Sequence, residues 1–319
     1  MRLEPSFRRG IALAACLFVS AVAQAAAPQV KTQAPGYYRM MLGDFEVTAL
    51  NDGTFAAPLD KLLSNTTPAK TDKALAAAYL KNPVETSVNG FLINTGTKLI
   101  LVDTGAGTYF GPTLGNLVAA LKASGYTPEQ VDEIYITHMH ADHIGGLFNA
   151  GKMVFPNAIV RADKHESDYW VSQAHLDAAP KDNKDFFKDA IEIMSPYIAA
   201  GKFKPFDGDT ELVPGIRALA SHGHTPGHTT YIVESQGQKL ALWGDLLHAF
   251  AVQFPTPSVT IAFDSDSKAA AVQREKAFVD AAKNGYWAAA AHLPFPGIGH
   301  LRANGTGFTW VPANYTSLR

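Results

Sequence analysis

Four potential metal ligands lie within six consecutive residues, in the run His138-Met139-His140-Ala141-Asp142-His143. Imidazole nitrogen binds Zn, Fe, Ni and Cu, and a carboxylate adds an oxygen ligand that can also accept a proton. The run follows residues 131–137, an apolar stretch that predicts a β-strand. His138 and His140 then lie on the same side of the extended chain, and a turn brings Asp142 and His143 back toward them. The spacing therefore predicts a transition-metal site.

Most of the other histidines also lie in or beside segments that predict turns. The chain has eleven histidines, and eight of them fall into three such segments, at His138, His140, His143, His222, His224, His228, His292 and His300. These segments are far apart in the sequence, so only the fold can bring them together. His222 and His300 are expected to face solvent or to pack against other side chains.

The elements that must position these residues are strands alternating with helices. Apolar patterns predict strands at residues 45–50, 86–94, 98–102, 131–137, 158–162, 230–234, 239–243 and 286–291, and helices at residues 114–123, 164–171 and 268–283. Asn51-Asp52-Gly53 predicts a turn after the first strand. Strands that deliver polar ligands at their carboxyl ends predict an α/β protein with a site along one sheet edge.

The composition is that of a globular protein with a full-sized core. The chain has 319 residues, of which 47% are hydrophobic and 18% charged, and a formal net charge of −2. It has no long basic run, and nucleic acid is therefore not expected as a partner.

Residues 1–25 predict a cleaved export signal. Arg2, Arg8 and Arg9 precede an apolar stretch at residues 11–23, and Ala23-Gln24-Ala25 fits a cleavage site. The stretch is shorter than the ~20 residues that span a bilayer, so no stable membrane insertion is expected after cleavage. Arg8-Arg9 leaves twin-arginine and general secretory export both open. The sequence predicts a periplasmic or secreted protein.

The mature chain is expected to be a single domain without cysteine. Cys16 is the only cysteine, and lipidation at this residue is the less favoured alternative because the apolar run before it is very short. Residues 26–36 predict a flexible lead-in, and residues 37–319 predict one domain without an internal linker.

Five motifs together resemble the metallo-β-lactamase superfamily. They are the HxHxDH run, Gly223-His224-Thr225-Pro226-Gly227-His228, Gly244-Asp245, Ala291-His292 and Asp103-Thr104-Gly105, in the order that the family shows. The resemblance covers about residues 45–300. It implies a four-layer αββα sandwich with the metal site at one edge of the two sheets.

The resemblance implies two divalent metal ions, with zinc as the default and Mn, Co or Fe also compatible with the ligands. His138, His140 and His224 would bind the first ion, and Asp142, His143 and His292 the second, with Asp245 bridging them. Spacing alone does not decide between His224 and His228, but the family places the ligand at His224. His228 and Asp103 are then expected to orient the ligands.

Such a centre can hydrolyse a substrate without a covalent protein intermediate. Zinc can lower the pKa of bound water from about 15.7 to ~7, and a second ion can polarise the substrate oxygen. Asp142 can orient the bridging hydroxide, or accept its proton and pass it to the leaving group. No GxSxG nucleophile motif competes with this interpretation.

A closer resemblance is to methyl parathion hydrolase and its lactonase-like relatives. It lies in residues 34–40, 99–105, 134–146, 220–228 and 295–300. It implies an exported hydrolase of organophosphate triesters, aryl esters or lactones, and a homodimer. It also implies an aromatic substrate pocket containing Phe110, Trp170 and either Phe186 or Phe187, although each of these aromatics could instead belong to the core.

Two further positions favour a lactone or an aryl ester as the main substrate. His248 can donate a hydrogen bond to a carbonyl or leaving oxygen, at a position where related lactonases often have tyrosine. Phe263 is bulkier than its aliphatic counterpart in the organophosphate specialist and would narrow the pocket for a phosphotriester. Organophosphate hydrolysis is expected as a side activity, and the alternative is that it is the main one. Thioesterase, β-lactamase, metal-dependent redox and non-catalytic metal-binding functions are less favoured.

Overall fold

The computed structural model describes residues 27–318. The predicted export signal and Cys16 therefore lie outside the described residues. Residues 27–34 contain no helix or strand and belong to a separate unit from the compact one that begins at Pro35, to which all that follows refers. No helix within residues 27–318 is long and apolar enough to cross a membrane.

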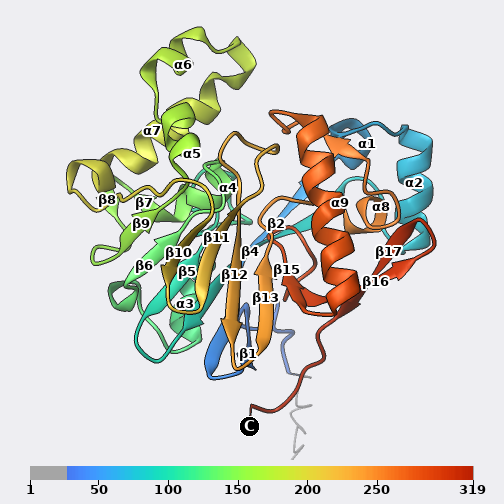
Figure 1. The fold of residues 1–319 in the computed structure, drawn as a ribbon, viewed down its shortest axis with the longest axis horizontal. Coiled ribbons are helices and arrows are strands. Elements are labelled where there is room, and N and C mark those ends of the chain that lie inside the picture. The colour runs from blue at the N-terminus through green and yellow to red at the C-terminus, as the bar shows by residue number, and fades with distance from the viewer. Residues whose placement is uncertain (1–26, 319) are drawn as a thin grey trace, which may run out of the picture. The chain divides into compact units, whose positions relative to one another are not determined.

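Two β-sheets form the framework of the compact unit (Figure 1). The first has six strands in the order β1 (Tyr37–Leu42), β2 (Phe45–Ala57), β4 (Val84–Asn94), β5 (Leu99–Val102), β6 (Glu133–Tyr135) and β9 (Ile159–Arg161). The second has seven, in the order β10 (Thr210–Val213), β11 (Ile216–Ala220), β12 (Thr229–Ser235), β13 (Gln238–Leu242), β15 (Trp287–Ala289), β16 (Ile298–Asn304) and β17 (Gly307–Pro312). Two small sheets pair β3 (Leu63–Ser64) with β14 (Thr260–Ile261) and β7 (Phe148–Asn149) with β8 (Lys152–Met153).

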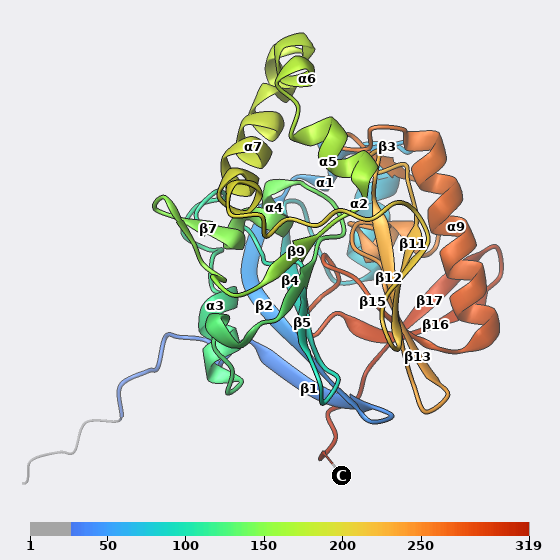
Figure 2. The same cartoon turned by 60° about the vertical axis from the view of Figure 1, so that its left-hand side comes forward.

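Helices cover the outer face of each sheet (Figures 1 and 2). The described residues form the helices α1 (Leu59–Leu62), α2 (Pro68–Ala77), α3 (Leu117–Ala123), α4 (Ala141–Ile144), α5 (Lys164–Trp170), α6 (Gln173–Ala178), α7 (Lys184–Ala199), α8 (Phe250–Gln253) and α9 (Ser267–Asn284), of which α6 extends away from the sheets. The core beside the first sheet includes residues of α3, α4, α5 and α7, and the core beside the second includes residues of α9.

The layers follow from the alternation of apolar residues along the central strands. In β5, Leu99 and Leu101 pack in the core with the helices, whereas Ile100 and Val102 pack in the core between the sheets. In β13, Leu240 and Leu242 face the other sheet, whereas Ala241 packs with α9. Successive side chains of a strand point to opposite faces, so each sheet is apolar on both sides. The four-layer αββα fold predicted from the sequence is confirmed.

Some predicted boundaries are wrong for identifiable reasons. The turn expected at residues 51–53 is a bulge inside β2, where the register against β4 shifts between Asn51 and Gly53. The buried carboxylate of Asp52 accepts hydrogen bonds from the backbone N–H groups of Ala106, Gly115 and Leu117. The Asp52 side chain therefore bonds backbone N–H groups of a distant loop and is not available to stabilise a turn at residues 51–53.

The Asp52 carboxylate also lies at the start of α3. The expected helix at residues 114–123 begins only at Leu117, whose N–H group bonds Asp52 Oδ1 at 2.9 Å. The strand expected at residues 131–137 is limited to β6, since Thr137 turns its side chain to Asp103. The sequence analysis did not predict α2, α6 or α7.

Candidate metal centre

The HxHxDH run lies where the chain leaves β6 and enters α4. His140 precedes the helix with an extended backbone, and Asp142 and His143 lie in its first turn. His138 Nε2 and His140 Nδ1 are 3.0 Å apart. The two histidines therefore direct nitrogen atoms to the same point, as their spacing predicted.

The remaining ligand candidates follow three strands of the second sheet. His224 follows β11, Asp245 follows β13 and His292 follows β15. β13 and β15 are parallel, with Leu242 opposite Ala289. Asp245 and His292 each lie three residues beyond this pair, so both reach the same edge of the sheet.

The first group of donor atoms consists of His138, His140, His224 and Asp245, whose ligand atoms all lie within 4.8 Å of one another. His224 Nε2 is 3.2 Å from His140 Nδ1 and 3.5 Å from Asp245 Oδ2. Three imidazole nitrogens and one carboxylate oxygen at these distances match the donor number and types of a tetrahedral zinc site.

The second group consists of Asp142, His143 and His292. Asp142 Oδ2 is 3.7 Å from His143 Nε2 and 3.4 Å from His292 Nε2. Asp245 also reaches this group, with Oδ1 at 3.3 Å from His143 Nε2 and Oδ2 at 3.2 Å from His292 Nε2. The carboxylate of Asp245 thus lies between the two groups, in the position of a bridging ligand.

Orphaned buried atoms support metal binding at both groups. His143 Nε2 and Asp245 Oδ1 are buried and have no hydrogen-bond partner among the described residues. Buried polar atoms without partners cost free energy, and metal ions at these positions would satisfy them. The residues present therefore fit two divalent ions.

Charge coupling keeps both carboxylates ionised. Burial raises the pKa of Asp142 and Asp245, but His143, His292 and, for Asp245, further histidines outweigh this and hold both pKa values below the usual range. Burial, with histidine neighbours adding to the effect, lowers the pKa of His138 and His140. At His143 and His292 the nearby carboxylates outweigh burial and raise the pKa, to about 10 for His292, so a metal ion there would displace protons from these two rings. Ionised carboxylates and neutral imidazoles are the states that bind metal.

Hydrogen bonds to the far side of the rings orient several ligands. Asp103 Oδ2 is 2.8 Å from His143 Nδ1, Asp264 Oδ1 is 2.8 Å from His224 Nδ1, and the Ser87 carbonyl oxygen is 2.9 Å from His292 Nδ1. Such partners fix the ring and its tautomer. Asp103 was predicted from its motif, whereas Asp264 belongs to no motif and was not predicted.

His228 supports the bridging residue instead of joining the donor groups. The Asp245 backbone N–H donates to His228 Nε2 at 3.0 Å, and His228 Nδ1 lies 2.8 Å from Ser221 Oγ. His224 is therefore the ligand candidate of its segment, a choice that spacing left open.

Glu166 is a further residue that the sequence analysis missed. Its buried carboxylate accepts hydrogen bonds from the Met139 and Gly227 N–H groups, each at 2.8 Å. Met139 belongs to the HxHxDH run and Gly227 to the segment that carries His224. Glu166 thus joins two ligand loops that lie far apart in sequence.

His248 lies beside the bridging carboxylate. Its Nε2 is 3.0 Å from Asp245 Oδ2, and its ring stacks on that of His292 with centroids 5.2 Å apart. Its Nδ1 atom is buried and has no hydrogen-bond partner within residues 27–318. Burial lowers the pKa of His248, so the ring is neutral near pH 7. A neutral ring has one N–H, and the Asp245 contact assigns it to Nε2.

Only some of the predicted aromatic residues contact the metal centre. Trp170 and Phe186 pack against His140, with ring centroids at 5.4 Å and 5.2 Å. Phe187 is buried behind Trp170 in the helical core, so the structure favours Phe186 of the two candidates. Phe110 lies on an exposed loop and makes no aromatic contact with the described histidines, and Phe263 is also exposed.

His222 and His300, the other two of the eight histidines in the turn segments, lie outside the centre. His300 stacks on Trp287 with centroids 3.8 Å apart, which is the packing role expected. His222 is partly buried beside Asp163.

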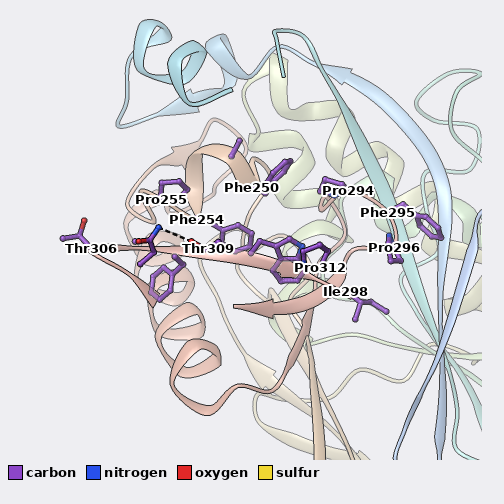
Figure 3. Close-up of a pocket in the computed structure, with 15 residues that line it drawn as sticks. Phe250, Phe254, Pro255, Pro294, Phe295, Pro296, Ile298, Thr306, Thr309 and Pro312 are labelled. Carbon is purple, nitrogen blue, oxygen red and sulfur yellow. Dashed lines mark hydrogen bonds between the residues drawn. The ribbon is translucent and has the colours of Figure 1, made fainter. Parts of the chain in front are cut away.

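Two hollows lie on the other side of the centre from Trp170. The inner one, of about 90 Å³, is lined by His248 and His292 together with apolar side chains that include Leu75 and Val84. The outer one, of about 600 Å³, is an aromatic groove between α8 and β17 (Figure 3). Phe250 and Phe295 line both hollows, so these two side chains separate the inner cavity from the groove.

The chain belongs to the metallo-beta-lactamase superfamily, whose sequence profile matches residues 83–282. This confirms the family that the motifs indicated. The superfamily combines the observed layered fold with the histidine and aspartate clusters described above.

Individual relatives include hydrolases and lactonases. The hydrolase AbOPH, known from a crystal structure, shares 37% sequence identity with this chain. The alignment covers 90% of this chain and 100% of AbOPH, with a TM-score of 0.85. AidC, described as a dizinc quorum-quenching lactonase, is 28% identical, covers 88% of this chain and 99% of its own, and has a TM-score of 0.82. An N-acyl homoserine lactonase of Bacillus cereus is 30% identical over 126 residues, which is 40% of this chain and 42% of that protein. The chain thus matches only about half of the length of such curated lactonases.

Proposed function

We propose that this chain is an exported binuclear zinc hydrolase that opens lactones or cleaves aryl esters, with weaker organophosphate hydrolysis. The observation that carries the proposal is the position of Asp245 between two groups of converging donors. Two zinc ions bound there would supply an activated hydroxide and polarise the acyl oxygen of the substrate. The lactonase activity of the relatives AidC and the B. cereus protein supports a lactone as substrate.

The side chains around the donors have separate roles in this proposal. Asp142 is ionised and partly open to solvent, so it can accept a proton from the attacking water and return it to the leaving oxygen. His248 Nε2–H, which donates to Asp245, is the only N–H that the neutral ring can offer to a substrate oxygen. Transfer of this hydrogen bond to the leaving oxygen would therefore stabilise ring opening.

The surroundings of the centre favour an acyl substrate with modest apolar groups. Trp170 and Phe186 form an aromatic wall beside His140. The inner cavity beside His248 and His292 is small and mostly apolar. An acyl chain or lactone ring can use both surfaces, whereas a phosphotriester must fit three substituents around a tetrahedral centre.

A substrate panel with metal analysis tests the proposal. Purified protein is assayed with N-acyl homoserine lactones, dihydrocoumarin, an aryl acetate, methyl parathion and a thioester. We expect two zinc ions per chain, the highest kcat/KM on a lactone or aryl ester, and loss of activity in His138→Ala. A higher kcat/KM for methyl parathion than for every lactone would support the organophosphate alternative. A bound metal without any hydrolysis would contradict the enzyme assignment.

Export is a separate part of the proposal and rests on the sequence of residues 1–25. Expression of the full chain in a bacterium, followed by mass spectrometry of the periplasmic fraction, tests it. We expect a mature protein that begins at Ala26, and an uncleaved cytoplasmic chain would contradict this expectation.

A further inference from the structure

A third group of metal-binding side chains lies outside the centre described above. Asp163, His165 and His222 each place one ligand atom within 4.8 Å of the other two. His165 Nδ1 is 2.8 Å from Asp163 Oδ1, and His222 Nε2 is 3.5 Å from Asp163 Oδ2. The two imidazole rings lie 5.1 Å apart. The group joins the start of α5 to the segment that carries His224.

The charge of this group lacks a permanent counterion. The Asp163 side chain is 0% exposed, and no lysine or arginine within residues 27–318 lies within 4.0 Å of it. Its oxygens accept hydrogen bonds from the His165 and Gly208 N–H groups. His222 Nε2 is buried and has no hydrogen-bond partner among the described residues. A buried carboxylate beside an unsatisfied imidazole nitrogen favours a bound cation.

The two histidines leave the group open to ions from solvent. The His165 side chain is 57% exposed and that of His222 is 34% exposed. The position of both residues is well fixed, because α5 packs closely against the neighbouring segment. A Cβ atom added at Gly227 would lie 2.2 Å from the Glu166 backbone nitrogen. Donors held by a rigid contact lose little entropy when an ion binds.

We propose that Asp163, His165 and His222 form a third metal site, distinct from the two-metal centre, that binds Zn2+ or a similar divalent ion. Two imidazole nitrogens and one carboxylate oxygen would bind the ion, which would replace the direct contact between His165 Nδ1 and Asp163 Oδ1. Water would complete the tetrahedron. The ion would fasten α5 to the segment of His224 and so stabilise that side of the centre.

Metal stoichiometry tests the proposal on untagged protein already loaded with two zinc ions. The protein is dialysed to equilibrium against increasing Zn2+, and bound zinc is measured by mass spectrometry. We expect saturation at three ions per chain for the wild type and two for His165→Ala. The matched control is His175→Ala, which removes an exposed histidine from the neighbouring α6 and should retain three. Saturation of the wild type at two ions, or a third ion in His165→Ala, would overturn the proposal.

Two further measurements separate a specific site from adventitious binding and do not depend on the substrate. Excess Zn2+ should raise the unfolding temperature of the two-metal wild type and of His175→Ala, but not that of His165→Ala or His222→Gln. Zinc anomalous scattering from a crystal should show a third peak between Asp163, His165 and His222. No peak there, or equal thermal shifts in all four proteins, would contradict the proposed site. Because these measurements involve no turnover, they stand apart from the test of hydrolysis.

Discussion

At the scale of single residues, His248 lies between the bridging carboxylate and the inner cavity. Its ligand atom lies within 4.8 Å of those of Asp245 and His292, so it borders the donors, yet neither of the two donor groups needs it to be complete. A residue in this position can act on the substrate without holding a metal. The proposed role is to stabilise the oxygen that leaves when the acyl bond breaks.

Replacing His248 by phenylalanine should therefore affect substrates according to their leaving groups. We expect kcat on a lactone to fall about 10–100-fold, since a developing alkoxide is poorly stabilised without a hydrogen-bond donor. The loss on a nitrophenyl ester should be smaller, because nitrophenolate leaves readily without one. Steady-state kinetics and zinc content on both substrates check this. Equal losses, or loss of zinc, would show that His248 acts through Asp245 instead.

The contribution of His228 to the stability of the site is expected to depend on pH. Its Nε2 accepts the Asp245 N–H, so a second proton on the ring would place two N–H groups against each other. Burial, with His224 adding to the effect, lowers its pKa to about 3, against ~6.5 in an unfolded chain. A lowered histidine pKa means that its stabilisation is present above pH ~6.5 and is lost as the pH falls toward 3.

Comparison of wild type with His228→Gln isolates this effect. In metal-free protein, the difference in unfolding free energy between them should shrink by about 1.3 kcal/mol from pH 7 to pH 5.5. Urea unfolding at the two pH values measures it. The other histidines of the centre are common to both proteins and cancel in the difference. A difference that is constant or grows at pH 5.5 would contradict a neutral, buried His228.

At the scale of elements, the centre depends on how α5 joins two loops. Glu166 lies in α5 and binds one N–H of each ligand loop. Burial raises the pKa of Glu166, while the two backbone N–H groups oppose this shift by favouring the ionised form. The helix thus sets the separation of the HxHxDH run from His224.

Glu166→Gln should weaken the centre without removing a metal ligand. Glutamine has one acceptor oxygen, so its amide N–H2 must face one of the two backbone N–H groups. We expect the free energy of unfolding to fall by about 2–3 kcal/mol and zinc affinity to fall about tenfold. Denaturant unfolding and competition with a zinc chelator measure the two effects.

A matched control lies on the same helix. Asp168 is exposed and pairs with Lys164, so Asp168→Asn should change both quantities little. Equal losses of unfolding free energy and zinc affinity in Glu166→Gln and Asp168→Asn would contradict a role of Glu166 in holding the two ligand loops.

At the scale of the whole molecule, the metal centre links the two sheets. The first sheet and α4 supply His138, His140, Asp142 and His143, whereas the second sheet supplies His224, Asp245 and His292. The second sheet's ligands lie beyond β11, β13 and β15, and the first sheet's beyond β6. Bound metal should therefore stabilise the association of the sheets as well as the site.

Removal of metal should lower the unfolding temperature strongly. Ligand held at about 1,000 times its dissociation constant contributes about 4 kcal/mol per site, which corresponds to an unfolding temperature on the order of 10 °C higher. Calorimetry before and after chelation, with zinc added back, measures the shift. His138→Ala, which lacks one ligand, should show a smaller shift. Unchanged unfolding temperatures after verified zinc removal would contradict metal binding at this centre.

Patterns within the sequence indicated an α/β protein with a site at one sheet edge and identified most ligand candidates, whereas the four-layer arrangement was implied by the family resemblance. Apolar alternation depends on local chain geometry, and HxHxDH brings four donors together within one turn. Asp245 and His292 follow strands whose patterns are clear in the sequence, whereas His224 follows β11, which the apolar patterns did not predict. The family resemblance then supplied the grouping of these seven donors, which spacing alone left open at His224 and His228.

Only the tertiary structure decided which residues support or surround those donors. Phe186 and Phe187 are neighbours on α7, and the rotation of that helix against the core determines that Phe186 reaches His140. Asp264 and Glu166 are acidic residues outside any motif, and their partners lie 40 and 61 residues away along the chain. The grouping of Asp163 with His222 likewise arises because α5 packs against a distant segment. Such contacts join residues through space, so no local pattern of the chain records them.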